Sequence, residues 1–516
     1  MSRVRVRRSG LVSFAVKLGS LLTGLVFTVL VTTHLSTSEF GLWSLIGKTL
    51  GYTLLPTSIL AFWTTRYRAR GVFLGKTIVV GSAIFSVVLS LVFLAISIPI
   101  ASTIHGQVTS SSNLFFFILS SPQIALYTFA ASFEALLWAT SPERNSVGFA
   151  SFEIAKVVIG FYMLDVLKLT LTGAILTVVF AQAFQFVLTI FLTRTEYKDK
   201  VSLQTISRMV KTGWLAILNN LHNLIRSFDF LVIAALTGSA NLLAYFAAAV
   251  VISTITGYSA YLGQGLYPSV LAGADPKRAT REVLELQLLF LFPMILGGIF
   301  LRMQLLNLLN HVYAVASGVL LVLVIGSGFD AAQSLFEYTI SASDTTDRDE
   351  AVNLSNYRHS KLFILSRINL SLAGAYLGSL AVVGVFFGRE ILANPSSTSL
   401  LLHVGIIWAS IYAGISFIAL VLKVYFSHKI APITLDLEMI RALLVGSAVF
   451  GILMYAFGRY YPFPLQNGEV LQALNIIGVG LLGLAVYVAI VYALSKTVRS
   501  LVKAIIQNLW ALPIRR

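Results

Sequence analysis

Five polar side chains recur along one otherwise apolar segment, residues 209–237. They are Asn219, His222, Asn223, Arg226 and Asp229. Their spacing of three, one, three and three residues predicts that they share one face of a helix. Arg226 and Asp229 are three residues apart and could pair. A single ion pair that only joins two helices would not need three more polar neighbours, so the stripe favours a hydrated surface that binds a polar ligand.

Two lysines in the first two apolar segments extend this set of cations. Lys17 lies nine residues beyond Arg8 and could instead extend to the membrane surface, whereas Lys48 lies deeper in its segment. Arginine can hold a phosphate group with two parallel hydrogen bonds, and lysine supplies a compact positive charge. The types of these residues therefore predict a site for an anionic, hydrogen-bonding ligand. The predicted substrate-binding residues are Lys17, Lys48, Asn219, Asn223 and Arg226.

Carboxylates in apolar segments form a second group. Asp330, Ser334 and Glu337 share one helical face of segment 311–340, and Asp229 lies on segment 209–237. A carboxylate inside a membrane can take a proton or Na⁺, which makes Asp229, Asp330 and Glu337 the predicted ion-coupling residues. For Glu337, near the end of its segment, simple hydration is the alternative.

The composition shows what kind of chain carries these residues. Of its 516 residues 57% are hydrophobic and 11% are charged, whereas soluble domains average roughly 45–50% apolar and about 25% charged residues. The net charge of +16 could suggest nucleic acid, but the basic residues lie in short stretches between long apolar segments. We therefore expect a membrane protein that binds no nucleic acid. With no cysteine there is no disulfide and no thiolate metal site.

Apolar windows of about 20 residues, the length needed to cross a bilayer, recur along the chain. They predict an all-α, multi-pass protein with about 14 transmembrane helices. The predicted spans are 11–33, 40–64, 76–101, 113–139, 147–165, 170–193, 209–237, 241–267, 282–303, 311–340, 361–388, 398–422, 441–459 and 470–495. Lys and Arg concentrate in every second loop between the spans, and such basic loops lie on the cytoplasmic side. We therefore expect a plasma-membrane protein with both termini in the cytoplasm.

The chain also contains a weak internal repeat. Residues 35–52 and 237–254 each follow a long apolar segment, cross a short polar turn and begin a new one with small and aromatic residues. Such repeats are common in transporters, where the substrate site lies between the halves. We expect six-helix lobes at 1–200 and 201–430, with two further helices and a basic cytoplasmic tail at 431–516.

Three stretches resemble the polysaccharide-flippase branch of the multidrug/oligosaccharidyl-lipid/polysaccharide (MOP) exporter superfamily. They are Leu35 to Tyr52, Arg226 to Ala248, and Gly265 to Val270. One departure is Leu243-Ala244, where a glycine is common in the family. The resemblance implies two six-helix bundles around a central cavity and alternating access. It also implies transport of a polyprenyl-phosphate-linked glycan from the inner to the outer leaflet, with membrane lipids and a coupling H⁺ or Na⁺ as partners.

Alternative functions remain at this point. A cation-coupled drug or metabolite exporter of the same superfamily would favour an acid-lined cavity. A membrane-embedded glycosyltransferase or glycan polymerase is less well supported, because the outer connections are short and the Asp347-Arg348-Asp349 loop has no nucleotide-binding domain beside it. No phosphate-binding loop or zinc motif is present, so we expect no enzyme activity, no cofactor, no metal and no catalytic residue.

Overall fold

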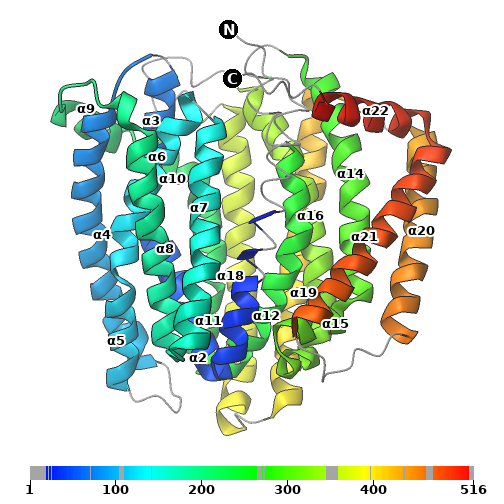
Figure 1. The fold of residues 1–516 in the computed structure, drawn as a ribbon, viewed down its shortest axis with the longest axis horizontal. Helices are drawn as coiled ribbons and strands as arrows, with labels where there is room; N and C mark the ends of the chain where they lie inside the picture. Colours follow the sequence, from blue (N-terminus) through cyan, green and yellow to red (C-terminus); the bar gives the residue numbers. More distant parts are fainter. Residues whose placement is uncertain are drawn as a thin grey trace. The chain divides into compact units, whose positions relative to one another are not determined.

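The computed structural model shows a helical chain (Figure 1). All regular elements within its described residues are helices. The described residues are 19–20, 23–24, 26–69, 71–103, 110–140, 142–263, 266, 270, 274–344, 358, 360–394, 397–433, 436–460 and 469–510. The predicted all-α membrane fold is thereby confirmed.

The expected spans recur as helices. In the described part of the chain, 11 helices are long and apolar enough to cross a membrane, and a bent pair of helices raises that number to 12. The bent pair corresponds to the predicted span 40–64. Of the predicted span 11–33 only part is described, and residues 26–34 of it are helical. The predicted span 209–237 is not one straight helix: it begins with the last residues of the helix Leu203–Lys211 and continues as two short helices that meet at Phe228.

The chain divides into two compact units. The N-terminal unit comprises Ser20–Ala247 and Ala373–Leu401, and the C-terminal unit comprises Met1–Gly19, Ala248–Leu372 and Leu402–Arg516. These units follow internal contacts rather than the sequence repeat, and the predicted division at residues 200 and 430 stays a prediction.

Besides the helical residues 26–34, ten α-helices of the described part of the chain lie wholly in the N-terminal unit. They are α2 (Thr37–Leu54), α3 (Thr57–Ala69), α4 (Gly75–Thr103), α5 (Ser110–Ser120), α6 (Pro122–Thr140), α7 (Pro142–Gly160), α8 (Thr170–Leu192), α9 (Leu203–Lys211), α10 (Trp214–Ser227) and α11 (Asp229–Thr237). Within this unit α4, α6, α7 and α8 run side by side (Figure 1). A π-helix at Phe161–Val166 ends α7 just before α8, which explains why the sequence break there is so short.

Local sequence sets the ends of the helices around the site. Ser36 caps α2 reciprocally with Glu39, which satisfies backbone donors at the start of that helix. Gly238 ends α11 with φ 60°, a left-handed conformation that glycine adopts readily. The helix α18 approaches α11 closely, because a side chain added at Gly388 would collide with the carbonyl oxygen of Leu236.

The C-terminal unit holds α14 (Pro276–Phe300), α15 (Arg302–Leu309), α16 (Ser317–Ala342), α20 (Leu437–Tyr460), α21 (Glu469–Leu494) and α22 (Lys496–Trp510). Three more helices have residues in both units, namely α12 (Ala240–Gly257), α18 (Lys361–Ala393) and α19 (Thr398–Ile430). Within the C-terminal unit α14 packs against α16 and α20, and α20 packs against α21.

Candidate functional site

A charged cluster in the N-terminal unit contains three of the predicted residues. Lys48 lies on α2, Arg226 ends α10 and Asp229 begins α11. The positive charges of Lys48 and Arg226 both act on the Asp229 carboxylate. The structure thus brings together residues that are far apart in the sequence and that were selected separately for their charge.

Asp229 is the buried centre of this cluster, with 8% of its surface exposed. One carboxylate oxygen accepts a hydrogen bond from the Phe230 amide at 2.8 Å, and the other accepts one from the Tyr376 hydroxyl at 2.9 Å. Asp229 is also the first residue of α11, where the positive end of the helix dipole favours a carboxylate. Together these partners hold the carboxylate in a fixed position.

Aromatic rings support both cations. The Lys48 ammonium lies 4.8 Å from the centre of the Phe230 ring, and the Arg226 guanidinium lies 5.8 Å from that of Tyr376. Cations at such distances are attracted to the face of an aromatic ring. Tyr376 is therefore a partner of both charges, because its hydroxyl binds Asp229 while its ring faces Arg226.

The break between α10 and α11 is fixed by α2. Tyr52, one turn after Lys48, donates a hydrogen bond to the carbonyl oxygen of Ser227, and its ring lies 4.8 Å from the Phe228 ring. The break places Asp229 on a separate helix, so the prediction of one continuous helix from Asn219 to Asp229 is wrong, and the shared face of the polar residues stays a prediction. The Tyr52 contact compensates a carbonyl group at the end of α10.

The remaining predicted binding residues have different outcomes. Asn223 lies one turn before Arg226 on α10 and its side chain is exposed. Asn219 lies on the same helix, and its side chain is outside the described residues. Lys17 is also outside the described residues, as are most of the Gly265 to Val270 stretch and the Asp347-Arg348-Asp349 loop.

A second polar cluster lies in the C-terminal unit around Asp330 of α16. The Tyr412 hydroxyl on α19 donates a hydrogen bond to Asp330 at 2.6 Å, and the Gln333 amide donates to its other carboxylate oxygen. Tyr412 packs closely on α16, because a side chain added at Gly326 would come within 2.7 Å of its ring. Asp330 is partly buried, and this arrangement suits a carboxylate that binds a proton or a cation.

Glu337 has a different surrounding from the simple hydration considered for it. Its carboxylate forms an ion pair with Lys423 of α19 at 2.7 Å and lies 3.5 Å from the Asn369 amide. The Lys423 side chain is 3% exposed and the Glu337 side chain 28%. Glu337 is therefore the counter-charge of a buried lysine, and binding a proton or Na⁺ there would compete with Lys423.

Sequence reasoning missed several of these partners. Tyr376, Tyr412 and Gln333 give no signal of their own, since tyrosine and glutamine side chains in apolar segments commonly serve packing. Lys423 lay one residue beyond the predicted span 398–422, whereas α19 continues to Ile430. A longer span would have drawn attention to it as a cation inside the membrane.

The buried charges, tyrosine partners and long apolar helices define a multi-pass membrane protein. No family model matches the sequence, and no curated protein matches it. Solved structures do match. One is described as the lipid II flippase MurJ in an inward closed conformation, with TM-score 0.58, 13% identity, and 94% of this chain and 99% of that chain covered.

Two other similar structures are also transporters. The eukaryotic MATE transporter AtDTX14 has TM-score 0.58 and 12% identity over 83% of this chain and 97% of that one. A MOP superfamily transporter from Pyrococcus furiosus has TM-score 0.53 and 15% identity over 82% of this chain and 96% of that one. The chain therefore has the fold of MOP superfamily membrane transporters, which confirms the resemblance at the level of the fold. These neighbours are transporters rather than enzymes.

Proposed function

We propose that the chain is a flippase that moves a lipid-linked oligosaccharide or polysaccharide precursor from the inner to the outer leaflet by alternating access. The supporting observation is that Lys48 and Arg226 lie over the rings of Phe230 and Tyr376, the two residues that donate hydrogen bonds to Asp229. This places two cationic side chains close to one another within helices of an apolar chain. A phosphate or diphosphate group of a polyprenyl-linked glycan supplies the opposite charge.

Asp229 gives the two cations a partner while no substrate is bound. A cation without a counter-charge inside a membrane costs about 2.5–3.5 kcal/mol on insertion scales. The arriving phosphate binds Lys48 and Arg226, and Asp229 keeps its hydrogen bonds from Phe230 and Tyr376. The exposed amide of Asn223, one turn along α10, is placed to bind a sugar hydroxyl.

The test is a flipping assay in proteoliposomes with a labelled polyprenyl-diphosphate oligosaccharide. In Lys48→Ala/Arg226→Ala we expect the rate to fall at least about 100-fold, since each charged hydrogen bond contributes about 1.5–3 kcal/mol and two are lost. A matched control is Lys200→Ala/Arg208→Ala, which removes the same charge from exposed positions of the N-terminal unit and should transport normally. Unchanged flipping in the first variant would reject the anion-binding role.

A cation-coupled drug or metabolite exporter is the second candidate, favoured by the hydrogen-bonded Asp330 carboxylate and by the MATE structures among the neighbours. Transport with clamped pH and Na⁺ gradients separates the two. If the protein exports cationic drugs, Asp330→Asn should abolish the dependence of transport on the ion gradient, and replacing Lys48 and Arg226 should not slow transport. A flippase for an anionic lipid should depend on Lys48 and Arg226 with either gradient.

We also propose that the protein lies in the plasma membrane with both termini in the cytoplasm.

A further inference from the structure

The last described helix, α22, has one basic face and one buried face. Val498 and Leu501 are buried in the C-terminal unit, with 0% and 3% of their surfaces exposed. Three basic side chains are exposed in the same part of the helix: Lys496, Arg499 and Lys503. Their spacing of three and four residues puts them on a single face, opposite the buried pair.

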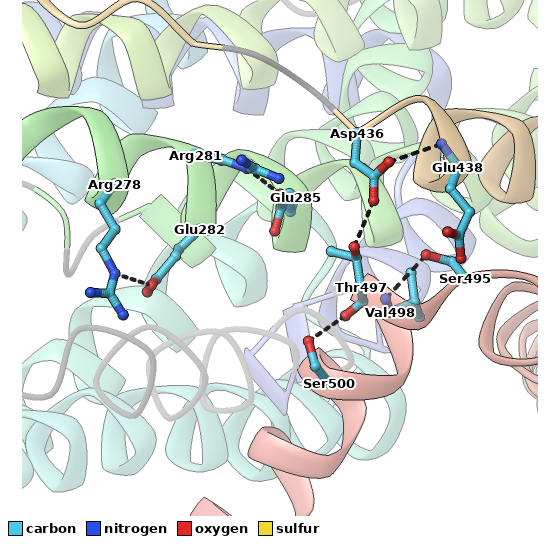
Figure 2. A network of polar contacts seen from close by, with 10 residues as sticks. All are labelled: Arg278, Arg281, Glu282, Glu285, Asp436, Glu438, Ser495, Thr497, Val498 and Ser500. Atoms are coloured by element: carbon cyan, nitrogen blue, oxygen red, sulfur yellow. Dashed lines mark hydrogen bonds and ion pairs between the residues drawn. The ribbon is translucent and has the colours of Figure 1, made fainter.

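Polar contacts fix the start of α22 to the start of α20. The Thr497 hydroxyl donates a hydrogen bond to Asp436 at 2.7 Å, and the Lys496 amide donates one to Glu438 at 2.8 Å. Ser495 caps α22 by accepting a bond from the Val498 amide. Figure 2 shows Asp436 between Glu438 and Thr497, so one carboxylate binds both helix starts.

This anchor persists at neutral pH. The hydrogen bonds from Thr497 and Glu438 lower the pKa of the Asp436 carboxyl, and the positive charge of Arg281 on α14 lowers it further. Arg281 is itself bound to Glu285 at 2.8 Å. Asp436 therefore stays ionised, and the acidic residues near α22 are engaged in holding helices together.

The anchor also sets the depth of α22. Asp436 immediately precedes α20, a helix long and apolar enough to span the membrane from Leu437 to Tyr460. A helix bound to that residue lies where α20 leaves the hydrocarbon, which is the headgroup layer. In Figure 1 α22 begins near the ends of α20 and α21 and runs crosswise to these helices rather than along them. Amphipathic helices with basic residues lie in this plane at membrane surfaces, and in α22 the apolar face packs on the C-terminal unit.

We propose that the basic face of α22 binds anionic phospholipid headgroups. Three basic side chains in one row at headgroup depth match the negative charge of lipid phosphates. The acids that anchor the helix bind its backbone and Thr497 rather than these side chains. Each basic residue near an anionic surface raises affinity about fivefold, so three raise it roughly 100-fold. The surface does not take part in the proposed binding of the glycan carrier.

The chain has no cysteine, so a single label can be attached to Ser500→Cys, an exposed position on the basic face. The full-length protein, labelled there with a fluorophore, is reconstituted in vesicles that contain phosphatidylglycerol or phosphatidylcholine with a nitroxide on the headgroup. We expect stronger quenching by the phosphatidylglycerol probe. The preference should weaken at high salt, which screens surface charges.

The variant Lys496→Gln/Arg499→Gln/Lys503→Gln should lower this preference at least about tenfold. A matched variant, Lys198→Gln/Lys200→Gln/Lys211→Gln, removes three exposed charges from the N-terminal unit and should keep it. Equal quenching by the two lipids, or quenching by neither, would overturn the proposal. So would loss of the preference on adding inorganic phosphate at constant ionic strength, because it would indicate a discrete phosphate site. Unfolding temperatures of the variants show whether α22 stays in place.

Discussion

The ion pair between Lys423 and Glu337 offers the sharpest test of how charge is held inside this fold. The two side chains differ in burial, with 3% of Lys423 exposed against 28% of Glu337. Glu337→Gln leaves the buried ammonium without this counter-charge, and breaking a buried pair in this way costs about 3–5 kcal/mol. Lys423→Met leaves the Glu337 carboxylate, which water can reach, so we expect a smaller loss of stability of about 1–2 kcal/mol.

The double variant Glu337→Gln/Lys423→Met leaves neither charge buried and should lie within about 1 kcal/mol of the original protein. The assay is thermal unfolding of the full-length protein in detergent. At about 1–2 °C per kcal/mol, extrapolated to a chain of this size, Glu337→Gln should unfold several degrees earlier.

Lys429→Met is the control, since it removes a lysine from an exposed position of the same helix, 4.3 Å from the Tyr425 ring. It should shift the unfolding temperature little. If the double variant instead lost the sum of the two single effects, the charges would not be coupled and the reasoning would fail.

Two further predictions concern the N-terminal unit. Burial raises the pKa of the Asp199 carboxyl, but hydrogen bonds from the Lys76 amide and from the Thr77 hydroxyl and amide lower it more. The stability that the ionised Asp199 contributes is therefore present above its ordinary pKa of about 3.9 and is lost as the pH falls through the lowered value. Asp199→Ala should lower the free energy of unfolding by about 0.5–2 kcal/mol at pH 7 and by less in acid. Unfolding measurements at both pH values test this. Gly41→Ala would place a carbon 2.7 Å from the Ala240 carbonyl oxygen and should lower the free energy of unfolding by about 1–3 kcal/mol. The control Gly47→Ala, on the same helix, meets nothing within 4 Å and should not destabilise the protein. Equal stability of the two variants in unfolding measurements would contradict the close approach at Gly41.

The apolar length of each segment was enough to predict most of the fold, because crossing a bilayer demands it. Helix breaks were harder to predict. The bend between α2 and α3 has a signal, since Pro56 lies in the gap between them. The break at Phe228 has neither glycine nor proline, and Phe228 keeps helical dihedral angles. It is recognised only from the tertiary contacts of Tyr52, which no local pattern contains.

The predictability of the clusters follows the same division. Charges in apolar segments are rare and costly, so Lys48, Arg226 and Asp229 were conspicuous in the sequence. Tyr376 was not, because tyrosine is common in membrane helices, and its hydroxyl becomes informative only beside a buried carboxylate. The transport roles of these residues stay predictions, since fold similarity at 12–15% identity does not assign them.

Each unit holds a carboxylate through the hydroxyl of a tyrosine on another helix. Asp229 is bound by Tyr376 of α18, and Asp330 by Tyr412 of α19. A hydrogen bond to an ionised carboxylate is roughly twice as strong as one between neutral groups. A proton or Na⁺ that neutralises either carboxylate therefore weakens the bond that joins it to α18 or α19. If these carboxylates are the ion-coupling residues, as the sequence predicts, ion binding would change helix packing directly, which is what coupling an ion gradient to movement requires.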